Sequence, residues 1–250
     1  MKLFSIFLIP FLVFGLNAQA KDLRFYTEDA PPYNFKEGGE LKGYAVDLIK
    51  RTLQVSNIPV TKDTIKLIPW ARGIKLTQKK GLHNVLFTTV RVPPREKKWK
   101  WVGPIDKPIT FALFAKKGTP ENTDLKAILK DKIAVVRKDV GETELMTRSK
   151  KLKVKANLFK TNTKEQMIKL VKTGKVKYLC FEEWGVRFKI KKMGLNNDDF
   201  VKVHTLFKLD AYYAFNKSIS DDVANGIQSS LDKVYKDKDF MKKLNQEYFE

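Results

Sequence analysis

The chain alternates between strand-like and helix-like segments along almost its whole length, and this alternation constrains the fold most. Short apolar or β-branched runs predict strands over residues 23–27, 65–68, 84–88, 111–115, 133–136, 178–181 and 209–215. Helical spacing and end signals predict helices over residues 44–55, 69–79, 142–149, 163–172 and 184–193, and from Ser220 onward. Strands that alternate with helices favour an α/β fold with helices layered on largely parallel sheets.

Three of the expected helices carry end signals. Proline suits a helix start, so Pro69 marks one of them. Thr163 is a suitable N-cap. Asp221 and Asp222 lie in the first turn of the last helix, where the helix dipole favours acids.

The N-terminus has the three-part pattern of a secretory signal peptide. Met1-Lys2 is followed by an apolar run from Leu3 to Leu16 and by the small-x-small end Ala18-Gln19-Ala20. The run is short for a membrane span, so we expect residues 1–20 to be a cleaved leader rather than an uncleaved anchor. No cysteine stands directly after the leader. We therefore expect a periplasmic protein that is not a lipoprotein.

The chain is strongly basic, with a net charge of +21 that falls to +20 when Lys2 leaves with the leader. Such a charge suggests either an anionic partner or solvated lysines, and the spread of the lysines favours the second. Cys180 is the only cysteine, so an internal disulfide and a multi-cysteine metal site are both excluded. It lies in an apolar strand-like run, which indicates a buried, inert thiol. We expect no metal and no cofactor.

Three motifs follow one another along the chain, and a fourth lies between the first and the second. They are Ala30-Pro31-Pro32-Tyr33-Asn34-Phe35 with Gly43-Tyr44-Ala45-Val46-Asp47-Leu48, Thr88-Thr89-Val90-Arg91-Val92-Pro93-Pro94-Arg95 with Trp101-Val102-Gly103-Pro104-Ile105, Gly174-Lys175-Val176 leading to Glu182-Glu183, and Pro69-Trp70-Ala71-Arg72. Together they resemble the extracellular solute-binding proteins of family 3, the amino-acid transporter type. The last motif is similar to a subgroup whose helix opens with Pro-Trp-Ala-Arg. The resemblance covers essentially the whole mature chain.

The resemblance implies a two-lobed periplasmic-binding-protein-like fold of type II, with two hinge strands between the lobes. The first lobe would comprise residues 21–110 plus 209–250, and the second lobe residues 111–208. The crossing segments would lie near residues 109–114 and 207–215. Such lobes close on a small solute like a clamp.

The function implied is that of a non-enzymatic, monomeric periplasmic receptor. It would capture a small carboxylate-bearing solute, an amino acid or an analogue, for an inner-membrane ABC-type permease. A sensor-linked receptor and a cyclohexadienyl-dehydratase-like enzyme on the same scaffold remain alternatives, and Glu182 or Glu183 could be the general acid of such an enzyme. His83 and His204 are isolated, and no nucleophile–base pair is visible. No nucleic-acid module is recognisable, so we expect no nucleic-acid partner.

The resemblance also implies a set of ligand-binding residues. Arg95 falls where the family places an arginine that grips the ligand carboxylate, which suits the planar fork of a guanidinium. Arg91 is either a second anion contact or a brace. The remaining expected residues of this half of the site are Thr88, Tyr33, Trp70 and Arg72.

Four further residues are expected from the other half of the chain. Glu182 aligns with the acid that holds a ligand ammonium, and Glu183 is the alternative one position later; both could instead simply begin a helix. Arg137 and Asp139 lie at a strand-to-helix turn that could hold an anion.

The chain departs from the family pattern at three positions. Val90 and Val92 stand where the family offers hydroxyls, and Ala30 stands where an aromatic often lies over the ligand. The solute is therefore not necessarily a standard amino acid.

Overall fold

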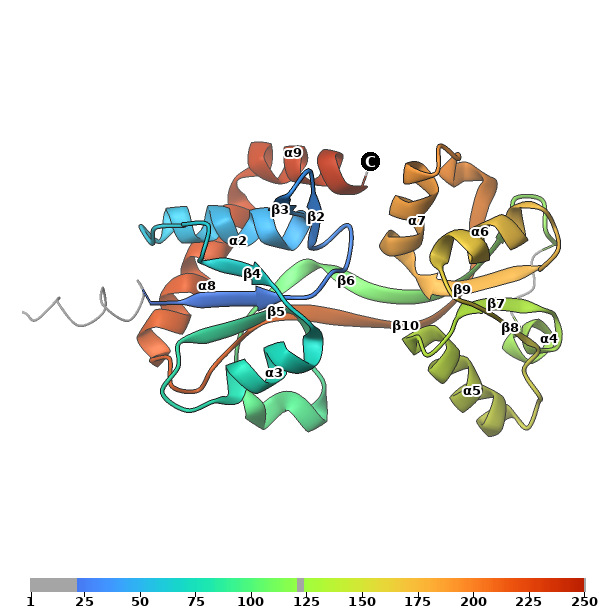
Figure 1. The fold of residues 1–250 in the computed structure, drawn as a ribbon, viewed down its shortest axis with the longest axis horizontal. Helices are drawn as coiled ribbons and strands as arrows, with labels where there is room; N and C mark the ends of the chain where they lie inside the picture. Colours follow the sequence, from blue (N-terminus) through green and yellow to red (C-terminus); the bar gives the residue numbers. More distant parts are fainter. Residues whose placement is uncertain (1–21, 121–123, 250) are drawn as a thin grey trace, which may run out of the picture.

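A computed structural model describes residues 22–120 and 124–249 of the chain. Its main feature is an eight-stranded sheet with the order β4-β1-β5-β10-β6-β9-β7-β8. Figure 1 shows two lobes, each with helices packed around its part of the sheet, and the long strands β6 and β10 running between them. The expected α/β fold with two connecting strands is therefore confirmed.

The elements of the described chain have the following bounds. The strands of the main sheet are β1 Arg24–Thr27, β4 Ile65–Leu67, β5 Asn84–Val90, β6 Lys100–Lys116, β7 Ile133–Val136, β8 Leu158–Thr161, β9 Tyr178–Glu182 and β10 Phe200–Phe215. A small hairpin consists of β2 Phe35–Glu37 and β3 Glu40–Lys42. The α-helices are α2 Tyr44–Val55, α3 Trp70–Gln78, α4 Leu125–Lys130, α5 Val140–Leu152, α6 Lys164–Lys172, α7 Glu183–Lys192, α8 Asp221–Lys236 and α9 Lys238–Phe249. Two 3-10 turns, η1 Pro93–Lys98 and η2 Asn197–Asp199, complete the set.

Strand direction in the main sheet changes at the crossing strands. β4, β1 and β5 are parallel in one lobe, and β9, β7 and β8 are parallel in the other. Between them, β10 runs antiparallel to β5 and β6, and β6 runs antiparallel to β9. The expected parallel strands occur within each lobe. Strands β6 and β10 pair along nearly their whole length and join both lobes into one mixed sheet.

Each lobe has its own apolar core. The first core packs α2, α8 and α9 against β1 and β5, with Phe25, Phe87 and Phe215 fully buried. The second lobe has one cluster on each side of its sheet. Cys180 is fully buried in one of these clusters, and burial raises the pKa of its thiol. The thiol is thus buried as expected.

The helix signals read from the sequence are confirmed in large part. Thr163 accepts the N–H of Gln166 at 3.2 Å as the N-cap of α6, and Ser220 caps α8. Pro69 takes the N-cap position of α3, one residue before the helix begins at Trp70. No helix within the described ranges is both long and apolar enough to cross a membrane. The expected leader, residues 1–20, lies outside the described residues, and the division into lobes at 110/111 and 208/209 stays a prediction.

Candidate functional site

The two lobes touch where the loops after their parallel strands meet. The loop that follows β1 carries Tyr33, and its hydroxyl donates to Glu182 Oε1, at the end of β9, over 3.4 Å. The same hydroxyl also donates to the carbonyl of Pro108 in β6 over 3.1 Å. Tyr33 is 2% exposed, so both bonds are shielded from water. Residues from the two lobes therefore meet beside the crossing strands.

Arg95 presents a partly buried positive charge on the first lobe. It lies in the η1 turn, and its Nη1 donates to the carbonyl of Val90 at 3.2 Å. Its Cζ lies 5.5 Å from the centre of the Trp70 ring, within cation–π range. Burial lowers the pKa of the guanidinium. Across residues 22–120 and 124–249, no carboxylate pairs with Arg95, so its remaining N–H groups are available to an anion.

Thr88 connects the end of β5 to the loop after β1. Its hydroxyl donates to Asn34 Oδ1, and the Asn34 amide donates in turn to the carbonyl of Glu28. Thr88 has a φ of 57°, in the left-handed region that a β-branched residue rarely enters. Its hydroxyl is thus engaged within the protein. Its partner, the fully buried Asn34, could not be identified from the sequence.

Arg91 has a different environment from Arg95. Its Nε donates to Glu96 Oε2 at 2.8 Å, and the resulting ion pair is exposed. The guanidinium also lies over the rings of Trp101 and Tyr212, at 5.6 and 5.4 Å. These contacts match a brace more closely than an anion contact. Arg72, on α3, is exposed.

Glu182 caps helix α7 from the second lobe. Its carboxylate accepts the N–H of Gly185 at 2.6 Å and the N–H of Trp184 at 3.2 Å, in addition to the Tyr33 hydroxyl. Burial raises the pKa of Glu182 to about 7, despite these hydrogen bonds, which lower it. The neighbouring Glu183 pairs with Lys202 at 2.7 Å and Arg187 at 3.5 Å. Both acids are therefore engaged within the protein.

Asp139 caps α5 in the same way. Its carboxylate accepts the N–H of Gly141 at 2.9 Å, so its own side chain occupies the helix N-terminus that the sequence suggested for an anion. Burial raises the pKa of Asp139. The Arg137 side chain is exposed. Asp139 therefore lies at this turn as expected, but because its own carboxylate caps the helix, the turn does not present an open anion site.

Lys164 is a residue that the sequence reasoning missed. It is the first residue of α6, next to the N-cap Thr163, and its Nζ lies 4.6 Å from the centre of the Phe181 ring. Burial lowers the pKa of the Lys164 ammonium, while the charges of Glu182 and Asp139 raise it. No carboxylate of the described chain is within ion-pair distance of it. One signal was available, because a lysine in the first turn of a helix opposes the helix dipole.

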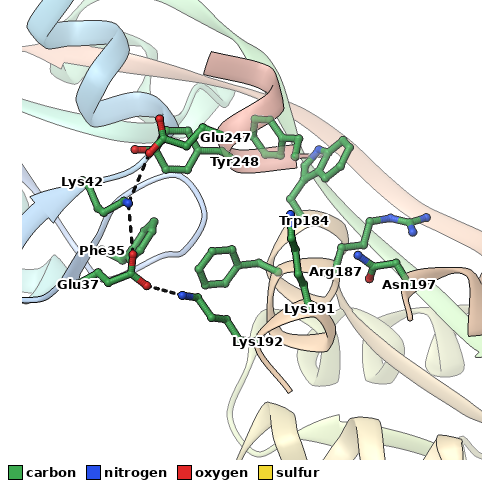
Figure 2. Close-up of a pocket in the computed structure, with 12 residues that line it drawn as sticks. Phe35, Glu37, Lys42, Trp184, Arg187, Lys191, Lys192, Asn197, Glu247 and Tyr248 are labelled. Carbon is green, nitrogen blue, oxygen red and sulfur yellow. Dashed lines mark hydrogen bonds and ion pairs between the residues drawn. The ribbon is translucent and has the colours of Figure 1, made fainter. Parts of the chain in front are cut away.

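A cavity of about 230 Å³ lies between the lobes (Figure 2), and Arg95 does not line it. Side chains of α7 and η2 line one wall, and side chains of the β2–β3 hairpin and the end of α9 line the other. Phe35 packs on Phe188 with ring centres 5.1 Å apart, and Trp184 packs on Phe249 at 4.5 Å. These aromatic pairs are further contacts between the lobes.

A series of ion pairs connects the two lobes beside this cavity, as the dashed lines in Figure 2 show. Lys192 of α7 pairs with Glu37 of the hairpin, and Glu37 pairs with Lys42 at 3.2 Å. Lys42 then reaches Glu247 of α9 at 3.4 Å. The hydrogen bond from Lys192 contributes most to lowering the pKa of Glu37. Exposed ion pairs contribute little free energy, so the aromatic contacts contribute most of the stability of this contact between the lobes.

The comparisons with known proteins agree with this architecture. The model of the bacterial extracellular solute-binding proteins, family 3, matches residues 23–250. The chain belongs to this family. No curated protein sequence matches the chain of this solute-binding protein significantly.

Three solved structures show how widely the fold of this solute-binding protein is used. An ancestral arginine-binding protein bound to arginine has a TM-score of 0.66 and 20% identity, covering 92% of this chain and 100% of that one. A histidine kinase sensor domain with similarity to periplasmic binding proteins has a TM-score of 0.65 and 18% identity, with coverages of 91% and 95%. An ancestral amino acid-binding protein, described as a precursor of cyclohexadienyl dehydratase, has a TM-score of 0.65 and 18% identity, with coverages of 93% and 97%. At these identities the likeness establishes the fold.

The hydroxyl proton of Tyr33, shared between the Pro108 carbonyl and Glu182, is expected to stabilise the solute-binding protein. Replacing Tyr33 by phenylalanine leaves the Pro108 carbonyl without this donor, at a cost of about 1 kcal/mol. Urea titrations of both proteins measure this loss directly. Tyr26→Phe is the matched control, because Tyr26 is partly buried in the same lobe and its hydroxyl forms no hydrogen bond within the described chain. An equal effect of the two variants would contradict a role for the Tyr33 hydroxyl.

Proposed function

We propose that this solute-binding protein captures a small carboxylate-bearing solute, an amino acid or an analogue, between its lobes. The observation that carries the proposal is the guanidinium of Arg95, which is partly buried, rests on Trp70 and has no acid partner in the described chain. Removing part of a charge from water without a partner costs free energy, and a ligand carboxylate would offset this cost.

The chemistry of the solute follows from the geometry of the guanidinium. Arg95 uses one N–H on the carbonyl of Val90, which leaves a planar edge for two parallel bonds to a carboxylate. The Trp70 ring lies against the guanidinium, with Cζ 5.5 Å from the ring centre. A carboxylate bound there would receive charge-assisted hydrogen bonds in a partly dry setting, where they are stronger than in water.

Delivery to an inner-membrane ABC-type permease, from the periplasm, is the cellular role that we propose. The N-terminal pattern of residues 1–20 supports export, and the resemblance to solute-binding proteins of the amino-acid transporter type supports a role in transport. The role is non-enzymatic and suits a monomer. A receptor that closes on its solute needs two lobes that move about a hinge, and β6 and β10 are the strands between the lobes.

A ligand screen by thermal denaturation tests the carboxylate proposal. The purified protein is screened against amino acids, small carboxylates and peptides, each paired with its carboxamide. A true solute at 100 times its dissociation constant is expected to stabilise the protein by about 2.7 kcal/mol, whereas its carboxamide gives no shift. Equal shifts from an acid and its amide would contradict recognition of the carboxylate.

The enzyme alternative has one observation in its favour. The pKa of Glu182, raised to about 7, would suit a general acid near neutral pH. However, two backbone N–H groups and Tyr33 already hold this carboxylate. Incubation with prephenate and arogenate, followed by product analysis, separates the two functions. Turnover of either compound that is lost in Glu182→Gln would contradict the receptor proposal.

A further inference from the structure

The acid that the family would use for a ligand ammonium is not free in this protein. Glu182 accepts three hydrogen bonds, from Gly185, Trp184 and Tyr33. Asp139, at the end of the neighbouring strand β7, is held by the start of its own helix. A carboxylate with its oxygens engaged in this way has little capacity left to accept the N–H donors of an ammonium group.

The protein also supplies an ammonium group of its own near Glu182, at the end of the Lys164 side chain. Lys164 begins α6 after strand β8, and its Nζ lies over Phe181, the residue before Glu182. Strands β8, β7 and β9 are neighbours and parallel, so the residues that follow them gather at one edge of the sheet. The charges of Glu182, Asp139 and Asp29 all act on Lys164. Asp29 belongs to the other lobe, in the loop after β1.

We propose that Lys164 takes the place of the ligand ammonium, so that the solute is a carboxylate without an α-amino group, such as a 2-oxo or 2-hydroxy acid. The inference rests on the proposed function, in which Arg95 holds the carboxylate. Lys164 has three N–H donors and no acceptor, so it can donate to an oxo or hydroxyl oxygen. An α-ammonium at the same position would face a like charge, and such a juxtaposition disfavours binding.

The opposite charges around Lys164 do not reverse this preference. Asp139 and Glu182 are satisfied by backbone N–H groups of α5 and α7. Asp29 is exposed, so water screens its charge. Lys164 is therefore the side chain that remains to donate to the solute, and its ammonium group favours an oxygen atom of the solute over an amino group.

Matched ligand series test this preference by calorimetry. Each series holds one side chain constant and compares the amino acid with its 2-hydroxy and 2-oxo acids, from the lactate and pyruvate of the alanine series to the indole compounds of the tryptophan series. In the series that binds, the oxo or hydroxy acid is expected to bind about tenfold or more tightly than the amino acid.

Two variants assign the effect to Lys164. Lys164→Met keeps an apolar chain over Phe181 but removes the charge. It is expected to weaken the binding of the oxo acid, so that the amino acid binds with an affinity equal to or higher than that of the oxo acid. Lys169→Met is the matched control, because Lys169 is an exposed residue of the same helix. It removes the same charge and is expected to change neither affinity. Lys164→Arg, which retains a donor cation, is expected to restore the preference against amines.

The outcomes distinguish the inference from the function on which it rests. If the amino acid binds best and Lys164→Met leaves that order unchanged, the inference is overturned while the carboxylate receptor stands. If no carboxylate of any series binds, the proposed function fails and the inference fails with it. A preference for the oxo acid that persists in Lys164→Met also overturns the assignment to Lys164.

Discussion

Replacing Arg95 by alanine is expected to abolish ligand-induced stabilisation while leaving the fold intact. The variant removes the two charge-assisted bonds that the guanidinium edge would make to the solute carboxylate. Loss of a buried charge partner typically costs several kcal/mol, so the affinity is expected to fall by about 100-fold or more. The measurement is the thermal shift at saturating ligand, supported by calorimetric titration.

The same substitution is expected to have little effect on the unliganded protein. Arg95 contributes one hydrogen bond to the Val90 carbonyl and one contact with the Trp70 ring. A partly exposed cation–π contact is worth about 0.5–1 kcal/mol. The unliganded variant should therefore unfold at nearly the wild-type urea concentration.

Arg91→Ala is the matched control for Arg95. Both residues belong to the same segment, but the Arg91 guanidinium is paired with Glu96 and exposed. Its removal is expected to leave the ligand-induced shift unchanged. An undiminished shift in Arg95→Ala, or an equal loss in Arg91→Ala, would contradict the assignment of Arg95 as the anion-binding residue.

Much of the fold could be predicted because the elements have clear local signals. α2 occupies residues 44–55 as expected, and β7 occupies residues 133–136 as expected, since apolar spacing and burial coincide there. The crossing strands were predicted only in part. Strand β6 begins at Lys100, eleven residues before the expected start at Phe111, and passes through Gly103 and Pro104, residues that normally interrupt strands.

The candidate site was less predictable than the fold. The sequence shows which residues could carry charge, but it does not show which charges are already paired. Arg91 and Arg95 are both arginines of one short segment, yet only the Arg91 guanidinium forms an ion pair with Glu96, and only that of Arg95 lies on Trp70. Likewise, nothing local to Lys164 indicates that Glu182 and Asp139 come near it, because the strands that position them are separated along the chain.

Replacing Glu182 by glutamine is expected to remove a large pH dependence from the stability of the protein. Burial raises the pKa of Glu182 in the folded state to about 7, above the ordinary value of 4.5. Between these two values the folded state holds a proton that the unfolded state has lost. Stability from this group is therefore complete below pH 4.5 and is lost as the pH rises to 7. The difference between the two pKa values corresponds to a contribution to the free energy of unfolding on the order of 3 kcal/mol.

Urea titrations from pH 4.5 to 8 measure this contribution as the difference between the wild type and Glu182→Gln. The free energy of unfolding of the wild type should fall relative to that of the variant across the interval. Glu142→Gln is the control, since Glu142 is another buried acid of the second lobe, but the hydrogen bond from Lys160 lowers its pKa. The contribution of Glu142 is present above pH 4.5 and is lost only at lower pH, so its difference curve should be flat over the same interval. A flat curve for Glu182→Gln would show instead that the Glu182 carboxylate is ionised throughout the interval. The N–H donors of α7 would then outweigh its burial, and the acid would be charged at the pH where the solute binds.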